Sequence, residues 1–520
     1  MGQLEAVLHQ LATSYDAFPY FSNAFKWCAP GHLRAVAHLY GLNVPPVASA
    51  RILEIGCAAG GNCLPAAFLY PDAHIVGVDI SEVQIREGQG VIARAGLSNI
   101  SLHAMSFTDI PDAWGPFDYI IAHGVFSWVP PTLQRALLHA CQRLLSPQGV
   151  AYISFNTYPG WKAHELLRDW MMWHTEPAVC YQERIEQARD LLPFIQEGLA
   201  VQNPLAPVLQ QLAQQVPASA QNDYYLAHEY LETHNHPLYF KDFCALAQQY
   251  GLAFVGEADV KEDLVQTYGL ATNASFQRVI QHKSRLEQLQ YLDYAVGRTF
   301  RKSLITHQTS CLTPTAPDLS RVADLRLAGW FTWQLLADGG YAVTSALSGQ
   351  FILRDARLLP LLDLLTQSWP RPVAGRDVMD YALQQGATDP LYLLQQLFLQ
   401  VPVEINRSYE DLPYCLQDYY TGLVPGVGQI IADRQQHLSQ MSEWNAWYSS
   451  STERFSAAEL FVIDRLHQEY SPLRTATALA QAWHMGQLPA DAVMPADPEQ
   501  AADDLVDEVI ARLRKYAMYV

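Results

Sequence analysis

The chain has 520 residues, which is too long for one hydrophobic core, so two to four domains are expected. Half of the residues are hydrophobic, which argues against a disordered chain, and 33 basic against 52 acidic side chains give a net charge of −19. This charge repels phosphate backbones and no run of lysine or arginine offsets it, so nucleic acid is not an expected partner.

The cysteines and the N-terminus bear on the compartment. The eight cysteines are scattered and form no C-x-x-C pair, which predicts buried thiols in a reducing compartment. Glu5 stands where a signal peptide carries positive charge, and no 18-residue apolar run occurs. These features predict a cytoplasmic protein without membrane insertion.

Between residues 51 and 156, short apolar runs alternate with helical segments. Strands are expected in five segments, 51–56, 74–79, 99–107, 117–124 and 149–156, with helices at 65–70, 81–97 and 132–145 between them. Because these strands are apolar throughout, both of their faces are expected to be buried. The pattern predicts an α/β fold with a Rossmann-like, doubly wound parallel sheet.

Residues 162–235 have helical spacing, and a helix and a strand follow within 239–259. The strand LAFVGE (252–257) is expected to rejoin the sheet. The first domain would then comprise 1–161 and 236–308, and 162–235 would be a helical insertion that serves as a lid or a dimer contact. A separate helical second domain is the alternative.

The C-terminal part begins after a linker at 309–320. Strands are expected at 340–346, 349–355 and 401–408, and helices at 358–369, 389–400 and 457–470. This order predicts an α+β accessory domain over 309–425, winged-helix-like around 357–408, and a C-terminal helical domain over 426–520. Residues 401–520 hold eight Lys/Arg against seventeen Asp/Glu, so the unit is not expected to read DNA.

The segment L-E-I-G-C-A-A-G-G-N (53–62) joins the first strand to a helix, and Asp79 ends the second strand. Such a turn lets a nucleotide approach the backbone, and the carboxylate can accept hydrogen bonds from ribose hydroxyls. As a dinucleotide fingerprint, the segment has Ala58 where a pyrophosphate needs glycine. As the E/D-x-G-x-G-x-G loop of class I S-adenosylmethionine-dependent methyltransferases, it departs only at Ala58, and this interpretation is favoured.

Six stretches, at 15–25, 52–67, 77–88, 117–130, 149–161 and 228–243, resemble one family. They are similar to bacterial methyltransferases with a methyltransferase regulatory domain, a group that includes rickettsial lysine methyltransferases of outer-membrane proteins. The resemblance is dense over about residues 15–300 and loose beyond. It implies a class I fold, S-adenosylmethionine as the cofactor and protein lysine as the acceptor.

The resemblance also implies roles for residues around the cofactor. The loop beneath the methionine portion would consist of Glu54, Gly56, Ala58 and Gly60. Asp79 would bind the ribose and Ile80 would stack on adenine, with the adenine edge contacted by Ser106 and Phe107. His123 and Gly124 end the fourth strand beside the sulfonium, and two residues would close over the cofactor, Tyr15 and Tyr20.

Methyl transfer to an amine requires that the nucleophile, the methyl group and the sulfur be collinear, and that the amine first lose a proton. His123 and Tyr158 are the candidates to assist that proton loss. An aromatic rim would suit a lysine side chain by cation–π attraction, and its candidates are Phe126, Trp128, Tyr158 and Trp161.

Each of these residues also has a structural interpretation. Asp79 could cap the following helix, His123 could be packed at a strand end, and the aromatic residues could belong to the core. The segment HEYLETHNH (228–236) has Glu232 where an H-E-x-x-H zinc motif needs histidine, so no metal is expected.

The sequence therefore predicts an S-adenosylmethionine-dependent N-methyltransferase that acts on a protein lysine, with a protein substrate as partner and a homodimer compatible with the pattern. Two alternatives stay open. One is a small-molecule methyltransferase whose extra domains enclose the pocket, and the other is a cofactor-binding regulatory scaffold without turnover.

Overall fold

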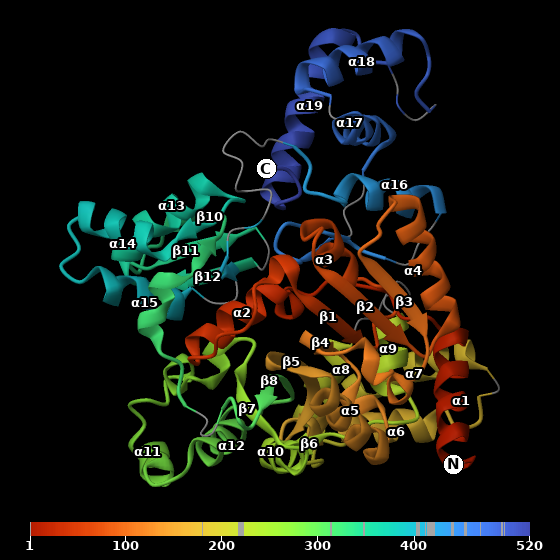
Figure 1. Ribbon diagram of the computed structural model, residues 1–520, viewed down its shortest axis with the longest axis vertical. Helices are drawn as coiled ribbons and strands as arrows, with labels where there is room; N and C mark the ends of the chain where they lie inside the picture. Colours follow the sequence, from red (N-terminus) through yellow and green to blue (C-terminus); the bar gives the residue numbers. More distant parts are fainter. Residues whose placement is uncertain are drawn as a thin grey trace.

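The computed structural model contains an eight-stranded sheet flanked by helices and two further units beyond it (Figure 1). The structure describes residues 2–178, 180–216, 223–311, 315–346, 349–401, 406–410, 412, 422–437, 441–451, 455–468, 470–489, 492 and 494–520. Within these ranges, no helix combines the length and apolar character needed to cross a membrane.

The main sheet has the strand order β3-β2-β1-β4-β5-β8-β7, and β6 pairs with the end of β5. Its strands are β1 (Arg51–Ile55), β2 (His74–Asp79), β3 (Ile100–Ala104), β4 (Phe117–Ala122), β5 (Leu145–Tyr158), β6 (Leu238–Tyr239), β7 (Leu252–Glu257) and β8 (Phe300–His307). Strands β1 to β5 are parallel, whereas β8 is antiparallel to both of its neighbours. The predicted fold class is confirmed, with β8 as an unpredicted strand.

Helices cover both faces of this sheet because alternate strand residues point to opposite sides. Ile52 packs into the cluster that includes α2 (Pro30–Leu39) and α3 (Cys63–Leu69), whereas Leu53 packs with α5 (Pro131–Leu144) and α10 (Phe240–Gln249). Helix α4 (Glu82–Ala95) begins at Ser81, whose hydroxyl accepts a hydrogen bond from the Gln84 amide. The apolar strands therefore have both faces buried, as their sequences predict.

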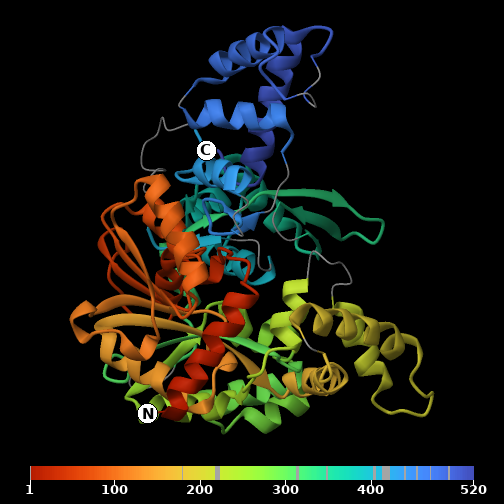
Figure 2. The same cartoon turned by 90° about the vertical axis from the view of Figure 1, so that its right-hand side faces the viewer.

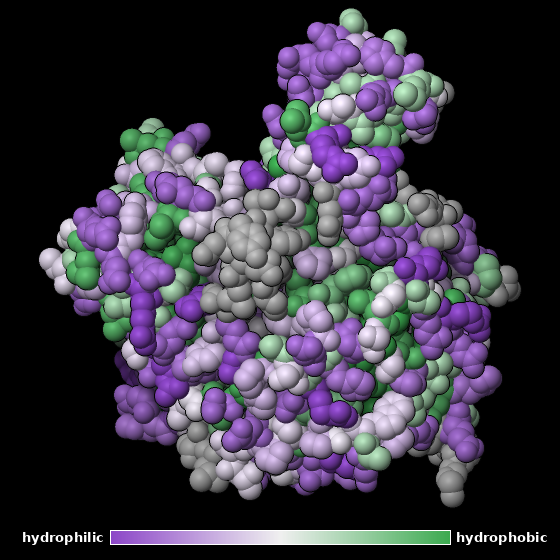
Figure 3. Space-filling model, turned by 45° about the horizontal axis from the view of Figure 1, so that its top comes forward, coloured by the Kyte–Doolittle hydropathy of each residue, from purple (hydrophilic) through white to green (hydrophobic). Residues whose placement is uncertain are grey.

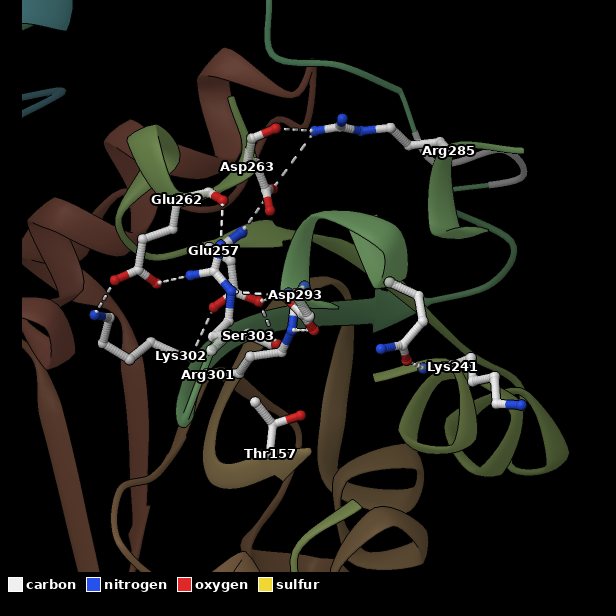
Figure 4. Close-up of polar contacts among 12 residues, drawn as sticks. Thr157, Lys241, Glu257, Glu262, Asp263, Arg285, Asp293, Arg301, Lys302 and Ser303 are labelled. Atoms are coloured by element: carbon white, nitrogen blue, oxygen red, sulfur yellow. Dashed lines mark hydrogen bonds and ion pairs between the residues drawn. The ribbon is translucent and has the colours of Figure 1, made fainter. Parts of the chain in front are cut away.

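Strand β8 carries two charged residues, Arg301 and Lys302, which is why its sequence did not predict a strand. Arg301 is fully buried, and its guanidinium bonds Glu257 Oε1 on β7 at 2.6 Å and Asp293 Oδ2 on α12 (Arg285–Val296) at 2.9 Å (Figure 4). Burial alone would raise the pKa of Glu257, but Arg301, Arg298 and the hydrogen bonds to its carboxylate together outweigh burial and hold the pKa below its ordinary value. This ion-pair cluster fastens β7 and α12 to β8.

Four helices follow β5 and precede β6 in the chain, and they share an apolar core of their own. They are α6 (Trp161–His174), α7 (Tyr181–Glu197), α8 (Ala206–Gln215) and α9 (Asp223–Tyr230). Figure 2 shows these helices at one side of the molecule, with α1 (Gly2–Ala17) between them and the sheet. LAFVGE forms β7 within the sheet, as expected. The domain boundaries drawn from the sequence, and a lid or dimer role for these helices, remain predictions.

Beyond the main sheet, α11 (Ala274–Ile280) precedes α12, and a unit of small sheets and helices follows β8. Strands β9 (Arg326–Ala328), β13 (Val373–Ala374) and β14 (Asn406–Ser408) pair in the order β13-β9-β14, and β10 (Phe331–Leu335), β11 (Tyr341–Ser345) and β12 (Gly349–Leu353) form an antiparallel sheet. The helices are α13 (Leu359–Ser368), α14 (Gly375–Gln384) and α15 (Pro390–Gln400). Part of the predicted strand 401–408, residues 402–405, lies outside the described residues.

The last part of the chain is mainly helical and comprises α16 (Val427–His437), β15 (Glu443–Trp444), β16 (Ser450–Ser451), α17 (Ala457–His467), α18 (Pro472–His484) and α19 (Pro498–Lys515). Helices α17 to α19 project from the rest of the molecule, with a largely hydrophilic surface on the face seen in Figure 3, whereas α16 lies beside α4. Arg94 on α4 forms an ion pair with the buried Asp433 on α16, which ties this part to the main sheet.

Candidate active site

The turn after β1 has an unusual backbone. Gly56 has a φ of +74°, and a Cβ added there would lie 2.3 Å from Val125 Cγ2, so no larger residue fits. Ala58 has a φ of +49°, in the left-handed region that L-residues avoid. The turn therefore holds Ala58 in a strained conformation, two residues after a position that requires glycine.

Asp79, at the end of β2, holds this turn in place. Its Oδ2 accepts the Ala58 amide hydrogen and its Oδ1 accepts the Ser81 amide hydrogen, each at 2.9 Å. Burial raises the pKa of Asp79, and the backbone hydrogen bonds limit the rise. Since Ser81 is the N-cap of α4, helix capping does not account for Asp79, and each carboxylate oxygen retains room for another donor.

Glu54 on β1 is buried beneath the same turn. Its carboxylate accepts hydrogen bonds from Asn62 Nδ2 and from the Cys63 thiol, both at 2.9 Å, and burial raises its pKa to about 7. Asn62 in turn accepts the Phe25 amide hydrogen at 2.8 Å. Glu54 therefore orients Asn62, which fastens the N-terminal segment to the turn.

A cavity of about 440 Å³ opens beside the turn, a size typical of small-molecule sites. Most of the predicted site residues line it: Tyr15, Tyr20, Glu54, Gly56, Ala58, Asp79, Ile80, Ser106, Phe107, His123, Gly124, Trp128 and Trp161. Its apolar wall includes Leu8 and Leu11 of α1, together with Met105, Val129 and Leu133. The N-terminal helix, the turns after β1 to β4, and helices α6 and α9 thus enclose one site.

Three predicted residues do not line this cavity. Gly60 packs against Leu102, where an added Cβ would lie 3.2 Å from Leu102 Cδ1. Phe126 is fully buried, with its ring centroid 5.5 Å from that of Phe243. The hydroxyl of Tyr158, the last residue of β5, donates to Glu165 on α6 in a partly buried contact.

The predicted aromatic rim is therefore wrong at Phe126 and Tyr158. Phe126 and Trp128 belong to one short 3-10 turn, in which neighbouring side chains diverge, so that Trp128 reaches the cavity and Phe126 enters the core. Trp161 lines the cavity and stacks on His164, with ring centroids 4.6 Å apart.

His123 lies in the cavity wall, packed against Phe25 with ring centroids 4.2 Å apart. Its Nδ1 is 3.0 Å from the Tyr152 hydroxyl. Burial, with a smaller effect from Lys302, lowers the pKa of His123 to about 4. At neutral pH this imidazole is uncharged and a weak base, so the geometry does not favour the predicted role as proton acceptor.

Two cavity residues that the sequence did not assign are His228 and Glu229 on α9. His228 Nδ1 lies 2.8 Å from Glu232 Oε1, and the His228 ring packs against Tyr15 and Tyr20 with centroids 5.8 and 5.0 Å away. The i, i+4 spacing of His228 and Glu232 is the signal in the sequence that corresponds to this contact. Among the described residues, no cluster of three or more His, Cys, Asp or Glu could hold a metal.

Comparisons with known proteins agree with this geometry. Residues 52–149 match the model of a methyltransferase domain, and residues 222–307 match that of a predicted methyltransferase regulatory domain. Two uncharacterized proteins of Rickettsia prowazekii are each 40% identical to this chain. RP789 aligns over 56% of this chain and 52% of its own length. RP028 aligns over 45% of this chain and 94% of its own length. The chain thus spans about half the length of RP789.

Among solved structures, the fold is similar to that of PKMT2 from Rickettsia typhi, with a TM-score of 0.79, 23% identity, and coverage of 96% of this chain and all of that chain. The same protein in complex with AdoHcy gives a TM-score of 0.78. The fold and site therefore define a class I methyltransferase, a class whose cofactor is S-adenosylmethionine. More narrowly, the chain belongs to the methyltransferases that carry a methyltransferase regulatory domain.

The residues present fit this cofactor. The Asp79 carboxylate has acceptor capacity left for ribose hydroxyls, and Ile80 and Phe107 form part of an apolar wall suited to adenine. Two buried polar atoms in the wall, Trp161 Nε1 and His228 Nε2, have no hydrogen-bond partner in the part of the chain that the structure describes. Unsatisfied buried polar atoms at a cavity are what a polar ligand would satisfy.

Proposed function

We propose that this protein transfers methyl groups to the nitrogen of lysine side chains in a protein substrate. The observation that carries the proposal is a single cavity that joins the glycine turn and Asp79 to a wall with two tryptophan rings and a carboxylate, Trp128, Trp161 and Glu229. Such a wall suits a cationic, partly apolar side chain.

On the cofactor side, the bound cofactor supplies an electrophilic methyl group on sulfur. Asp79 would accept the ribose hydroxyls, and the backbone around Gly56 and Ala58 would lie against the methionine portion. Leu8, Leu11 and Tyr15 of α1 cover the cavity and exclude water, which favours transfer between desolvated groups.

On the acceptor side, the ring of Trp161 and the ring of Trp128 would hold the lysine stem. Glu229 supplies negative charge that would attract the ammonium group into the cavity. The resemblance to rickettsial lysine methyltransferases supports the same acceptor. Orientation and desolvation of the amine are therefore the contributions of this wall.

The test is label transfer from tritiated S-adenosylmethionine to a bacterial lysate, separated into protein and small-molecule fractions. We expect label in protein bands and methyl-lysine after acid hydrolysis, at rates that fall sharply with the Asp79→Asn variant. Label confined to small molecules would favour the small-molecule alternative. Binding of S-adenosylhomocysteine without label in either fraction would favour the regulatory scaffold.

We also propose that the protein acts in the cytoplasm and forms a homodimer through helices α6 to α9. Large apolar side chains are exposed there, including Trp173 at 71% and Phe194 at 51%. Sedimentation equilibrium of the full chain would test the dimer, with Trp173→Glu as the variant expected to be monomeric. A monomeric wild-type chain at micromolar concentration would refute this assignment.

A further inference from the structure

Glu229 is a cavity residue supplied by the segment that matches the regulatory-domain model. It lies in the last turn of α9, beside His228, and both line the same cavity as the glycine turn after β1. The segment with the regulatory name therefore contributes directly to the wall where the acceptor would be placed.

The carboxylate of Glu229 has no hydrogen-bond or ion-pair partner among the described residues, although it is partly buried. The buried indole nitrogen of Trp161 and the buried Nε2 of His228 in the same wall also lack one. Because Nδ1 of His228 is engaged by Glu232 Oε1, Nε2 is the ring nitrogen left to contact a ligand. The acceptor side thus offers a lone carboxylate, which accepts hydrogen bonds, beside an unengaged imidazole nitrogen.

The end of α9 is held firmly in place. The buried Arg168 on α6 donates to the carbonyl oxygen of Tyr230 at 2.7 Å and to that of Glu232, and His164 Nδ1 lies 3.1 Å from the Tyr230 hydroxyl. These contacts fix the backbone on the C-terminal side of Glu229. A carboxylate on a fixed backbone is suited to a role that needs precise placement.

We propose, resting on the lysine methylation proposed above, that Glu229 is the catalytic proton acceptor for the substrate amine. An N–H bond of the lysine ammonium breaks, an O–H bond forms on the Glu229 carboxylate, and the electron pair stays on the nitrogen. The freed pair then attacks the methyl carbon as the carbon–sulfur bond breaks, with its electrons left on sulfur. Glu229 afterwards releases the proton to solvent.

The charge around Glu229 is compatible with this role. Burial raises the pKa of Glu229 to about 7, and the positive charge of Arg168 limits the rise. The titratable and charged groups that face it or line the same cavity are Arg168 and His164 on α6, Tyr225, His228 and Tyr230 on α9, Tyr15 and Tyr20 of the N-terminal segment, Glu54 and Asp79 at the glycine turn, and His123 after β4. A base with a pKa near the working pH is the most effective in general-base catalysis.

The experiment measures initial rates of methyl-lysine formation from pH 6 to 9.5, with tritiated S-adenosylmethionine and a subsaturating amount of urea-unfolded total bacterial protein, diluted out of urea. In the wild type we expect the rate to rise about fivefold from pH 6 to pH 7, to rise about twofold more by pH 8, and to level off above that. Glu229→Gln should lower the rate at pH 7.5 by about 10²–10⁴-fold. Its rate should continue to rise through pH 9.5, because only the lysine, with an ordinary pKa of about 10.4, then titrates.

Two variants serve as controls. Glu186→Gln removes a carboxylate at an exposed position on α7 and should match the wild type at every pH. Glu229→Asp keeps a carboxylate one methylene shorter and should retain the plateau at a reduced rate. Calorimetry with S-adenosylhomocysteine should give similar affinities for all variants, which shows that the fold and the cofactor side are intact.

The two proposals fail in different ways. If the wild type labels no lysine, the proposed function is refuted and Glu229 loses its role with it. If the wild type methylates lysine, but Glu229→Gln keeps its rate or its plateau above pH 8, the assignment of Glu229 alone is overturned. A lowered rate with an unchanged pH profile would mean that Glu229 is only structural.

Discussion

Ala58, the strained residue in the glycine turn, is a position where glycine should increase the stability of the protein. Replacing Ala58 by glycine should stabilise the protein, although glycine normally destabilises by loosening the unfolded chain. At a φ of +49°, an L-residue costs about 1–2 kcal/mol that glycine does not. The added freedom of glycine in the unfolded state costs about 0.4–1 kcal/mol. The free energy of unfolding should therefore rise by about 0.5–1 kcal/mol.

Gly56→Ala is the matched variant, because Gly56 has the same sign of φ but no space. The added methyl would meet Val125 Cγ2 at 2.3 Å, so it adds a clash to the backbone strain. Since Val125 lines the cavity, the clash would also disturb the cofactor site. We expect this variant to be destabilised and to lose affinity for S-adenosylhomocysteine.

Urea unfolding, followed by tryptophan fluorescence, measures both effects. In a chain with several domains, the relevant transition is the one that S-adenosylhomocysteine shifts to higher urea, because the ligand binds only the folded site. Ala58→Gly should move that transition upward and Gly56→Ala downward. A lower midpoint for Ala58→Gly would show that the turn is not strained at Ala58 and would refute the reasoning.

Three further predictions concern the same domain. Asp79→Asn should weaken the binding of S-adenosylhomocysteine, measured by calorimetry, by at least about tenfold, or 1.4 kcal/mol, because an amide nitrogen cannot accept the hydrogen bonds that a carboxylate oxygen accepts. An unchanged affinity would refute the assignment of Asp79 to the ribose. Arg301→Leu should destabilise the fold by about 3–5 kcal/mol, because the buried Glu257 would lose its paired cation and Asp293 would keep only Arg298; a wild-type unfolding midpoint would contradict this. Because the pKa of Glu257 is lowered in the folded protein, its carboxylate contributes stability that is fully present above its ordinary pKa of about 4.3. This contribution is lost as the pH falls through the pKa of the folded state. The melting temperature should therefore fall between pH 6 and pH 3, and a flat profile would count against this linkage.

The parallel part of the sheet was predictable because most positions in its strands are apolar. Strands buried on both faces leave a direct mark in the sequence, as in residues 75–78. Strand β8 leaves no such mark, because its Arg301 and Lys302 are typical of exposed segments. Burial of Arg301 depends on Glu257 and Asp293, and burial of Lys302 depends on Glu262, which pair with them only in the folded protein.

The candidate site divides in the same way. The cofactor side follows a local pattern, since the turn and Asp79 belong to consecutive strands whose ends meet at one edge of the sheet. The acceptor side does not, because Glu229 reaches the cavity from a helix more than 100 residues after Trp128. The aromatic rim failed at Phe126 because composition near a strand end does not reveal which side chain of a tight turn faces inward.

The position of β8 has a consequence for synthesis of the chain. β8 pairs between β5 and β7 but leaves the ribosome after both. From Tyr158 to Phe300, elongation at about 5–20 residues per second takes roughly 7 to 30 seconds. For that time, most of the edge of β5 that faces away from β4 has no neighbouring strand. If β7 paired with β5 there, it would occupy the place that β8 takes in the completed sheet. A nascent chain at this stage is open to wrong strand pairing, and in the completed fold the ion pair between Arg301 and Glu257 holds β8 against β7.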